Sequence, residues 1–167
     1  MRLIAANGFL VSCDLEGRGA LADAIEAEVP ENWPPELYDH KAMAFAGRQL
    51  RDPDEAGWSF WYVLERTDDG QVLVGICGFK GRPDKQGMIE IGYSVLEQFR
   101  NRGFASEAVA RLVEWAFSHG LVREIRAETF PHLKQSIRVL EKNGFSHRGA
   151  GSEHGVVCYA VDRSNLI

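Results

Sequence analysis

Residues 90–105 read EIGYSVLEQFRNRGFA, and this stretch decides the fold of the chain. Its first part is typical of an apolar strand, residues 98–105 of a turn rich in arginine, and residues 103–119 of an amphipathic helix. The first turn of a helix offers unpaired backbone N–H groups and the positive end of the helix dipole. The pattern therefore predicts an anion site, most naturally for phosphate. An ordinary strand–turn–helix with a charged turn remains the alternative.

The sequence lacks the motifs of two other phosphate-binding loops. It contains no Gly-x-x-x-x-Gly-Lys-Ser/Thr, which excludes a Walker-type loop, and no Gly-x-Gly-x-x-Gly opens a helix early in the chain, which disfavours a Rossmann site. The predicted turn lies past the middle of the chain, after several strands. In this turn Gly103 lets the backbone approach an anion closely, and the small Ala105 leaves room for the ligand.

Two motifs in the second half of the chain resemble a known family. Residues 91–95, followed by Arg100-x-x-Gly103-x-Ala105, are similar to the acetyl-CoA motif of the GNAT superfamily of N-acetyltransferases. Residues 106–108 and 136–145 resemble the branch that includes ribosomal-protein N-terminal acetyltransferases. The resemblance covers roughly residues 71–149, because the first 55 residues match only in general layout.

The resemblance implies an α+β fold in a single domain over residues 1–167. A central mixed, mostly antiparallel sheet of about seven strands would be flanked by about four helices. The acetyl-CoA-binding core would occupy about residues 71–149. The elements that face the acetyl acceptor would lie at about residues 14–55 and 146–160.

Apolar periodicity and turn residues give the same order of elements. Prolines within residues 29–35 must separate the first two helices, and Trp33 lies among them beside Glu31 and Glu36. An aromatic ring beside carboxylates suits an amine ligand; the other interpretation, which we expect, is that Trp33 packs its own loop down. Strands are predicted at residues 3–13, 58–65, 71–79, 88–96, 122–129, 145–148 and 156–161, and helices at residues 20–28, 36–50, 103–119 and 134–143.

Composition places the chain among ordinary globular proteins. Its 167 residues suffice for one compact core, with 45% hydrophobic and 26% charged residues. The net charge of −5 argues against a nucleic-acid partner and favours cationic partners such as amines. No apolar run approaches a membrane span, and no metal-binding spacing of Cys and His occurs. Cys13, Cys77 and Cys158 lie in apolar, strand-like runs, so we expect buried thiols in a reducing cytoplasm.

Glu90 is the first candidate catalytic residue. It stands in the middle of an apolar strand, between Ile89 and Ile91. A carboxylate there is costly unless it is paired, hydrated or functional, and desolvation would raise its pKa from about 4.3 toward neutrality. The family resemblance points to the same residue, because many members use a glutamate on this strand as a general base. A partly exposed glutamate in an ordinary ion pair is the alternative.

The resemblance also implies how acetyl-CoA would be held. The strand would splay from its neighbour, so that the backbone of Tyr93, Ser94 and Val95 could bind the pantetheine arm as an added strand would. The Tyr93 side chain itself is expected in the core. The pyrophosphate would be wrapped by Arg100, Asn101, Arg102, Gly103, Phe104, Ala105 and Ser106. The alternatives to this role are that the two arginines are solvated surface charges and that the serine caps the helix.

Ser136 is the second candidate catalytic residue, because two departures from the superfamily pattern lead to it. Leu133 stands where many members carry an asparagine that bonds the cofactor arm, and Leu140 stands where many carry a tyrosine that protonates the leaving thiolate. Ser136 is the nearest hydroxyl on the same predicted helix, and a serine acid is consistent with the resembled branch. A structural role in the first turn of that helix, and the absence of any acid, remain open.

These features predict an acetyl-CoA-dependent N-acetyltransferase that moves the acetyl group directly to a primary amine of a small molecule or a peptide N-terminus. No cysteine lies in the motif, so a covalent acetyl-enzyme is disfavoured. The alternative is a catalytically inactive CoA-binding sensor or partner module. A monomer and a homodimer are both compatible with the sequence, as is a longer acyl group.

Overall fold

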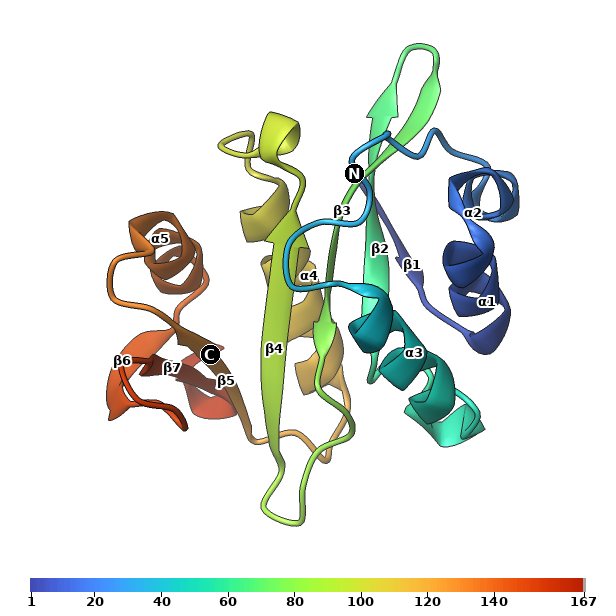
Figure 1. Cartoon of the computed structure of the whole chain (residues 1–167). Coiled ribbons are helices and arrows are strands. Elements are labelled where there is room, and N and C mark those ends of the chain that lie inside the picture. Colours follow the sequence, from blue (N-terminus) through green and yellow to red (C-terminus); the bar gives the residue numbers. More distant parts are fainter. Residues whose placement is uncertain (167) are drawn as a thin grey trace.

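The computed structural model describes residues 1–166 as a seven-stranded sheet with helices on both faces (Figure 1). The strand order is β1-β2-β3-β4-β5-β7-β6, and only the β4–β5 pair is parallel within this range. The expected mixed, mostly antiparallel sheet is therefore confirmed, with five α-helices rather than about four. The strands are β1 (Arg2–Ala5), β2 (Phe60–Thr67), β3 (Gly70–Phe79), β4 (Met88–Val95), β5 (Glu124–Thr129), β6 (Ser146–Ala150) and β7 (Val157–Asp162), and the helices are α1 (Gly8–Glu16), α2 (Arg18–Ile25), α3 (His40–Gln49), α4 (Phe104–Ser118) and α5 (Lys134–Lys142).

The prediction of one strand over residues 3–13 is wrong. Strand β1 ends at Ala5, and helix α1 begins at Gly8. Asn7 separates them, because its side-chain oxygen accepts a hydrogen bond from the Leu10 N–H (2.9 Å) and so caps the helix. Cys13 is consequently a buried helical residue, although all three cysteines are buried free thiols as expected.

Helix α3 begins at His40, four residues later than predicted. Leu37 adopts a left-handed backbone (φ 69°), which a continuous helix from Glu36 does not permit. Asp39 then caps the helix by accepting a hydrogen bond from the Ala42 N–H (2.9 Å). Residues 29–39, called the connection 29–39 below, thus form most of one long connection between α2 and α3.

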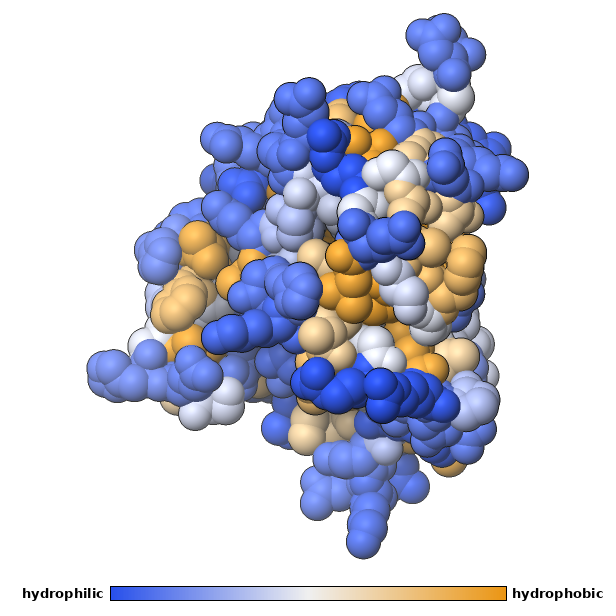
Figure 2. Space-filling model, turned by 45° about the vertical axis from the view of Figure 1, so that its right-hand side comes forward, coloured by the Kyte–Doolittle hydropathy of each residue, from blue (hydrophilic) through white to orange (hydrophobic). Residues whose placement is uncertain are grey.

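Two hydrophobic cores lie on opposite faces of the sheet. On one face, α4 packs across β3 and β4, and α5 packs against α4 and β5. On the other face, α1, α2 and α3 cover side chains of β2 and β3 such as Tyr62 and Leu73. Figure 1 shows these three helices gathered beside β1–β3, so within residues 1–166 no helix covers β5, β7 and β6 on that face. Figure 2 shows a largely hydrophilic surface with scattered apolar spots.

A buried carboxylate holds the connection 29–39 in place. Asp14 of α1 is 7% exposed and accepts hydrogen bonds from Trp33 Nε1 (2.8 Å) and from the Tyr62 hydroxyl (3.0 Å). Burial raises the pKa of Asp14, and the two hydrogen bonds oppose that rise. The contacts confirm the expectation that Trp33 packs its loop down. The neighbouring Tyr38 hydroxyl is buried without a hydrogen-bond partner in the described part of the chain.

Replacing Asp14 by alanine is expected to lower the free energy of unfolding by about 2–4 kcal/mol, because two buried donors lose their acceptor. Urea unfolding followed by tryptophan fluorescence measures the change. Asp23→Ala is the matched control, since Asp23 is an exposed aspartate on the adjacent helix α2. We expect that control to stay within about 0.5 kcal/mol of the wild type. A loss for Asp14→Ala no larger than the control's would contradict the anchoring role.

Candidate active site

Strands β4 and β5 separate after a short paired segment. Their pairing covers only Met88–Glu90 against Glu124–Arg126, although β4 runs on to Val95 and β5 to Thr129. Figure 1 shows β5 turning away from β4, with α5 beyond the wider end of the opening. The edge of β4 past Glu90 is therefore free of a partner strand on its β5 side. This confirms the expected splay, and such an edge can accept an extended ligand through its backbone.

The turn after β4 leads directly into an open helix terminus. Asn101 (φ 61°) and Gly103 (φ 90°) both have left-handed backbones, and α4 begins at Phe104 with no side chain capping it. Ser106 therefore does not cap the helix. A Cβ on Gly103 would meet no atom within 4 Å, so the space beside the turn is open. Uncapped N–H groups facing open space fit the phosphates of a nucleotide-like ligand.

Both arginines of the turn have protein partners. Arg100 Nε donates to the Val95 carbonyl (3.0 Å), and its terminal nitrogen pairs with Glu36 of the connection 29–39 (3.2 Å). Arg102 pairs with Glu65 of β2 and lies over the rings of Phe99 (5.7 Å) and Phe104 (5.2 Å). Arg100 thus holds the turn at the end of β4. The positive charge that stays accessible to a ligand is the N-terminal end of the α4 dipole.

A second contact joins the turn to the connection 29–39. The amides of Asn32 and Gln98 exchange two hydrogen bonds, of 2.8 and 2.9 Å. Together with the Glu36–Arg100 pair, they fasten the segment held by Asp14 to the start of the candidate phosphate turn. The segment expected to face the acceptor therefore lies next to the predicted cofactor turn.

Tyr93 and Ser136 meet across the wide end of the opening. Tyr93 points to the same side as the buried Ile89 and Ile91, where its ring packs against the α4 core as expected. Its hydroxyl lies 3.1 Å from the Ser136 carbonyl oxygen, to which it can donate, and 3.1 Å from the Ser136 hydroxyl oxygen, a contact in which either oxygen can be the donor. Burial raises the pKa of Tyr93, against a lowering by the Ser136 hydrogen bond. The two candidate elements, β4 and α5, are therefore linked by hydroxyl groups.

Glu90 points to the opposite face of β4, away from α4. Its side chain is 27% exposed and forms an ion pair with Lys80, which is itself 68% exposed. The ion pair matches the alternative expectation for Glu90. Lys80 lies opposite Glu90 across the β3–β4 hairpin, where its N–H bonds the Glu90 carbonyl (3.0 Å). The hairpin register was the sequence signal that could have revealed this partner.

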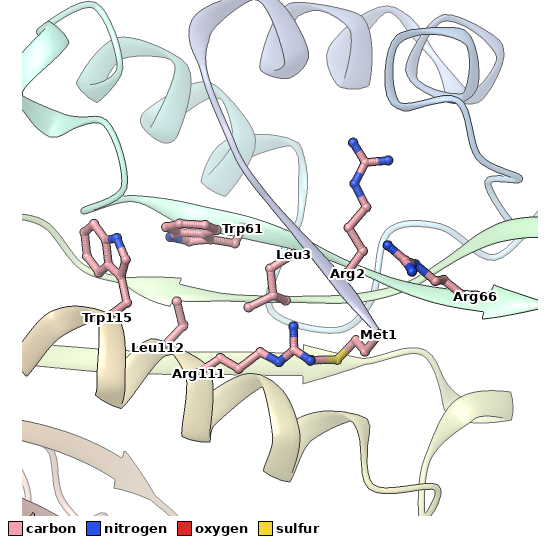
Figure 3. Close-up of a pocket in the computed structure, with 8 residues that line it drawn as sticks. All are labelled: Met1, Arg2, Leu3, Trp61, Arg66, Arg111, Leu112 and Trp115. Atoms are coloured by element: carbon pink, nitrogen blue, oxygen red, sulfur yellow. The ribbon is translucent and has the colours of Figure 1, made fainter. Parts of the chain in front are cut away.

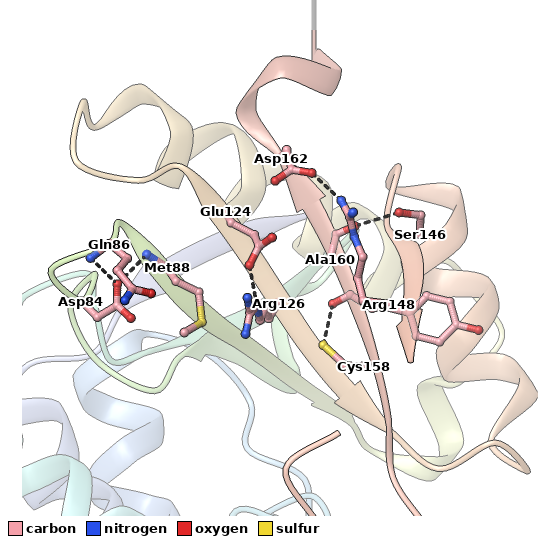
Figure 4. A network of polar contacts seen from close by, with 11 residues as sticks. Asp84, Gln86, Met88, Glu124, Arg126, Ser146, Arg148, Cys158, Ala160 and Asp162 are labelled. Atoms are coloured by element: carbon pink, nitrogen blue, oxygen red, sulfur yellow. Dashed lines mark hydrogen bonds and ion pairs between the residues drawn. The ribbon is translucent and has the colours of Figure 1, made fainter. Parts of the chain in front are cut away.

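Charged side chains on β5 continue this open face. Glu124 pairs with Arg126, which lies opposite Glu90 in the β4–β5 register (Figure 4). Glu128 accepts hydrogen bonds from the N–H (2.7 Å) and hydroxyl (2.6 Å) of Ser152, in the β6–β7 loop. Burial raises the pKa of the nearby Cys158 thiol, and Arg126 opposes that rise. Glu90 thus stands at the last paired position of β4, where the opening begins, with Lys80 and Arg126 as its nearest charged neighbours on this face.

The candidate residues form one continuous path. Tyr93, Ser94 and Val95 line the free edge of β4, and residues 100–106 continue it to the start of α4. Ser136 faces this path from α5. Asn143 also ties α5 to α4 by donating to the Ser106 carbonyl (3.3 Å), a contact that the sequence reasoning missed. Neither a spacing rule nor a local pattern connects residues 37 positions apart.

A separate cavity of about 350 Å³ lies between α4 and the β1–β2 edge (Figure 3). Leu3, Trp61, Leu112 and Trp115 give it an apolar lining, whereas Arg2 and Arg66 extend away from Leu112 in Figure 3. It shares no residue with the free edge of β4 or with the turn, so it is not part of the candidate site.

No helix within residues 1–166 is long and apolar enough to cross a bilayer. Over the same residues, no group of three or more His, Cys, Asp or Glu is placed to hold a metal ion.

The chain matches the family model of the acetyltransferase (GNAT) domain over residues 17–146. It is 30% identical over 131 residues to the uncharacterized N-acetyltransferase YjdG of Bacillus subtilis, covering 77% of each chain. One similar solved structure is the ribosomal-protein-S5-alanine acetyltransferase of Vibrio fischeri (TM-score 0.66, 15% identity, 96% of this chain and 92% of that one). Another is the microcin C7 self-immunity acetyltransferase MccE in complex with acetyl-CoA and AMP (TM-score 0.58, 15% identity, 93% and 84%).

At these identities the two structures show a shared fold alone. The family is shown by the domain match, which spans most of the chain, and by the relative aligned over the larger part of both sequences. The chain therefore belongs to the GNAT family of acetyltransferases and is an acyltransferase.

Proposed function

We propose that the protein is an acetyl-CoA-dependent N-acetyltransferase that transfers the acetyl group directly to a primary amine. The observation that carries the proposal is the free edge of β4, which runs through a left-handed Gly103 into the uncapped terminus of α4. The extended arm of a ligand fits the strand edge, and a pyrophosphate attached to that arm fits the helix terminus that follows it. Acetyl-CoA carries both groups, and the family uses it as its acetyl donor.

Each predicted residue has a defined part in this proposal. The backbone of Tyr93, Ser94 and Val95 binds the pantetheine arm, and residues 100–106 bind the pyrophosphate. These elements belong to a cofactor-binding core at about residues 71–149 of the single domain 1–167. The acceptor-side elements, at about residues 14–55 and 146–160, include the connection fastened by Asp14 and the loop held by Glu128.

In the transfer step the neutral amine attacks the thioester carbonyl. A C–N bond forms, the C–S bond breaks, and the electron pair of the broken bond goes to sulfur. Glu90 takes the proton that the amine gives up, directly or through water. Ser136 faces the departing sulfur as a hydrogen-bond donor, and the thiolate takes its final proton from Ser136 or from water. Positioning of the two substrates supplies much of the remaining rate enhancement.

The acceptor is proposed to be a small-molecule amine or a peptide N-terminus. The net charge of −5 favours a cationic group over a nucleic acid. The similar Vibrio fischeri protein is named for an alanine of a ribosomal protein, in keeping with a peptide N-terminus. We propose a cytoplasmic enzyme that acts as a monomer or homodimer. Nothing in the structure or the comparisons supports the alternative, an inactive CoA-binding module.

Saturating acetyl-CoA is expected to stabilise the protein, because only the folded chain presents the turn and the free strand edge together. At 100 times the dissociation constant the gain is about 2.7 kcal/mol. A thermal-shift titration with acetyl-CoA measures it, and the amines of a screening panel then test turnover. An unchanged melting temperature at saturating acetyl-CoA would overturn the donor assignment.

A further inference from the structure

We propose that Tyr93 is a positioning residue that aims the Ser136 hydroxyl at the departing sulfur of acetyl-CoA. This inference rests on the proposed function and goes beyond it, because Tyr93 was assigned only a backbone role in cofactor binding. The observation behind it is the pair of 3.1 Å contacts from the Tyr93 hydroxyl to the carbonyl and the hydroxyl oxygen of Ser136.

The Tyr93 ring is held firmly enough to act as a support. It is half-buried against the core under α4, on the side of β4 that carries Ile89 and Ile91. The ring thus belongs to the sheet, whereas its hydroxyl reaches α5 at the far side of the opening. A serine side chain alone can rotate among three staggered positions. The two contacts with the fixed Tyr93 hydroxyl favour one of these three positions.

The number of hydroxyl protons determines which hydrogen bonds Ser136 can donate. Tyr93 has one hydroxyl proton, and Ser136 presents two acceptors to it. The proposal requires this proton on Oγ rather than on the carbonyl, because only then is the Ser136 proton left free to point elsewhere. Burial raises the pKa of Tyr93, which favours the protonated hydroxyl and so keeps it a hydrogen-bond donor. A donor at Oγ also polarises the Ser136 hydroxyl, which strengthens the hydrogen bond that it gives.

The placement of Ser136 suits a hydrogen bond to sulfur. It lies in the first turn of α5, a helix with no side-chain cap, and faces the free edge of β4 where the thioester would lie. As the C–S bond breaks and sulfur takes the electron pair, the Ser136 hydroxyl donates a hydrogen bond to it. Tyr93 does not lose its proton in this step. Its contribution is to keep the donor pointed at the charge that develops.

A double-mutant cycle tests the inference in the full-length enzyme with acetyl-CoA and an accepted amine. Ser136→Ala is expected to lower kcat about 10- to 100-fold, because a hydrogen bond to a charged group is lost. Tyr93→Phe keeps the ring and is expected to lower kcat about 5- to 10-fold at nearly unchanged KM for acetyl-CoA. The double variant should be no slower than Ser136→Ala, since Tyr93 acts only through Ser136.

Ser118→Ala is the control for the loss of a hydroxyl, because the Ser118 hydroxyl also donates to a backbone carbonyl (Trp115, 2.6 Å) but lies at the end of α4 opposite to the candidate phosphate turn. It should retain wild-type kcat. Additive losses in the double variant, or an effect of Tyr93→Phe on KM alone, would overturn the inference and leave Tyr93 a structural residue. Wild-type turnover by Tyr93→Phe would overturn it too. Failure of the wild type to acetylate any amine would instead refute the proposed function, which separates the two outcomes.

Discussion

Replacing Gly103 by valine is expected to abolish acetyl-CoA binding and leave a folded protein. Gly103 has φ 90° and ψ −5°, a left-handed conformation that a β-branched residue strongly disfavours. Its missing Cβ would project into open space, with no protein atom within 4 Å, so the fold offers no steric obstacle. The strain of about 1–2 kcal/mol is within the stability of an ordinary domain. The valine methyl groups would instead occupy the approach of a phosphate to the first N–H groups of α4.

Titration calorimetry with CoA measures the effect, and circular dichroism checks the fold. Gly155→Val is the matched control, since Gly155 in the β6–β7 loop also has a left-handed backbone (φ 81°) and open space around its missing Cβ. That variant carries similar strain away from the turn and should bind CoA normally. If both variants lost affinity alike, strain rather than blocked access would explain the loss. Tight CoA binding by Gly103→Val would refute the phosphate role of the turn.

The sheet was predictable because its information is local. Strands β2, β3 and β4 alternate apolar and polar residues or form apolar runs bounded by turn residues, and their observed bounds lie within two residues of the predicted ones. The start of α1 was not predictable in this way. Residues 9–13 are apolar enough for a strand, and one side-chain cap at Asn7 together with packing against α3 decides for a helix.

The same distinction between local and long-range information applies to the candidate site. The free edge of β4 and the left-handed Gly103 follow from a motif contained in 16 consecutive residues, which read EIGYSVLEQFRNRGFA. The partners of the charged groups in this motif do not follow from it. Arg100 pairs with Glu36 and Arg102 with Glu65, 64 and 37 positions away, so the sequence alone left both arginines undecided between ligand and solvent. Such pairings depend on how loops fold back on the sheet.

Replacing Glu90 by glutamine is expected to lower kcat by about 10²–10⁴-fold with little change in affinity for acetyl-CoA. Glutamine keeps the shape of the side chain and part of its hydrogen bonding, but it cannot take the proton of the amine. The exposed Lys80 that pairs with Glu90 can swing aside at small cost, because surface ion pairs contribute little. Lys80→Gln should therefore stay within a few-fold of the wild type. Steady-state kinetics against pH, with calorimetry for acetyl-CoA, measure these effects.

Glu124→Gln provides the matched control for the charge change. Glu124 is also a half-buried strand glutamate in an ion pair, 23% exposed, but it lies opposite Met88, two positions further into the paired segment than Glu90. Its neutralisation should leave kcat nearly unchanged, because the paired strands leave no opening for a substrate amine at the depth of Met88 and Glu124. Suppose instead that Glu90→Gln turns over at the wild-type rate with an unchanged pH profile. Glu90 would then be only the partner of Lys80, and proton transfer would pass to water or to Glu128, the remaining carboxylate on the β5 side of the opening.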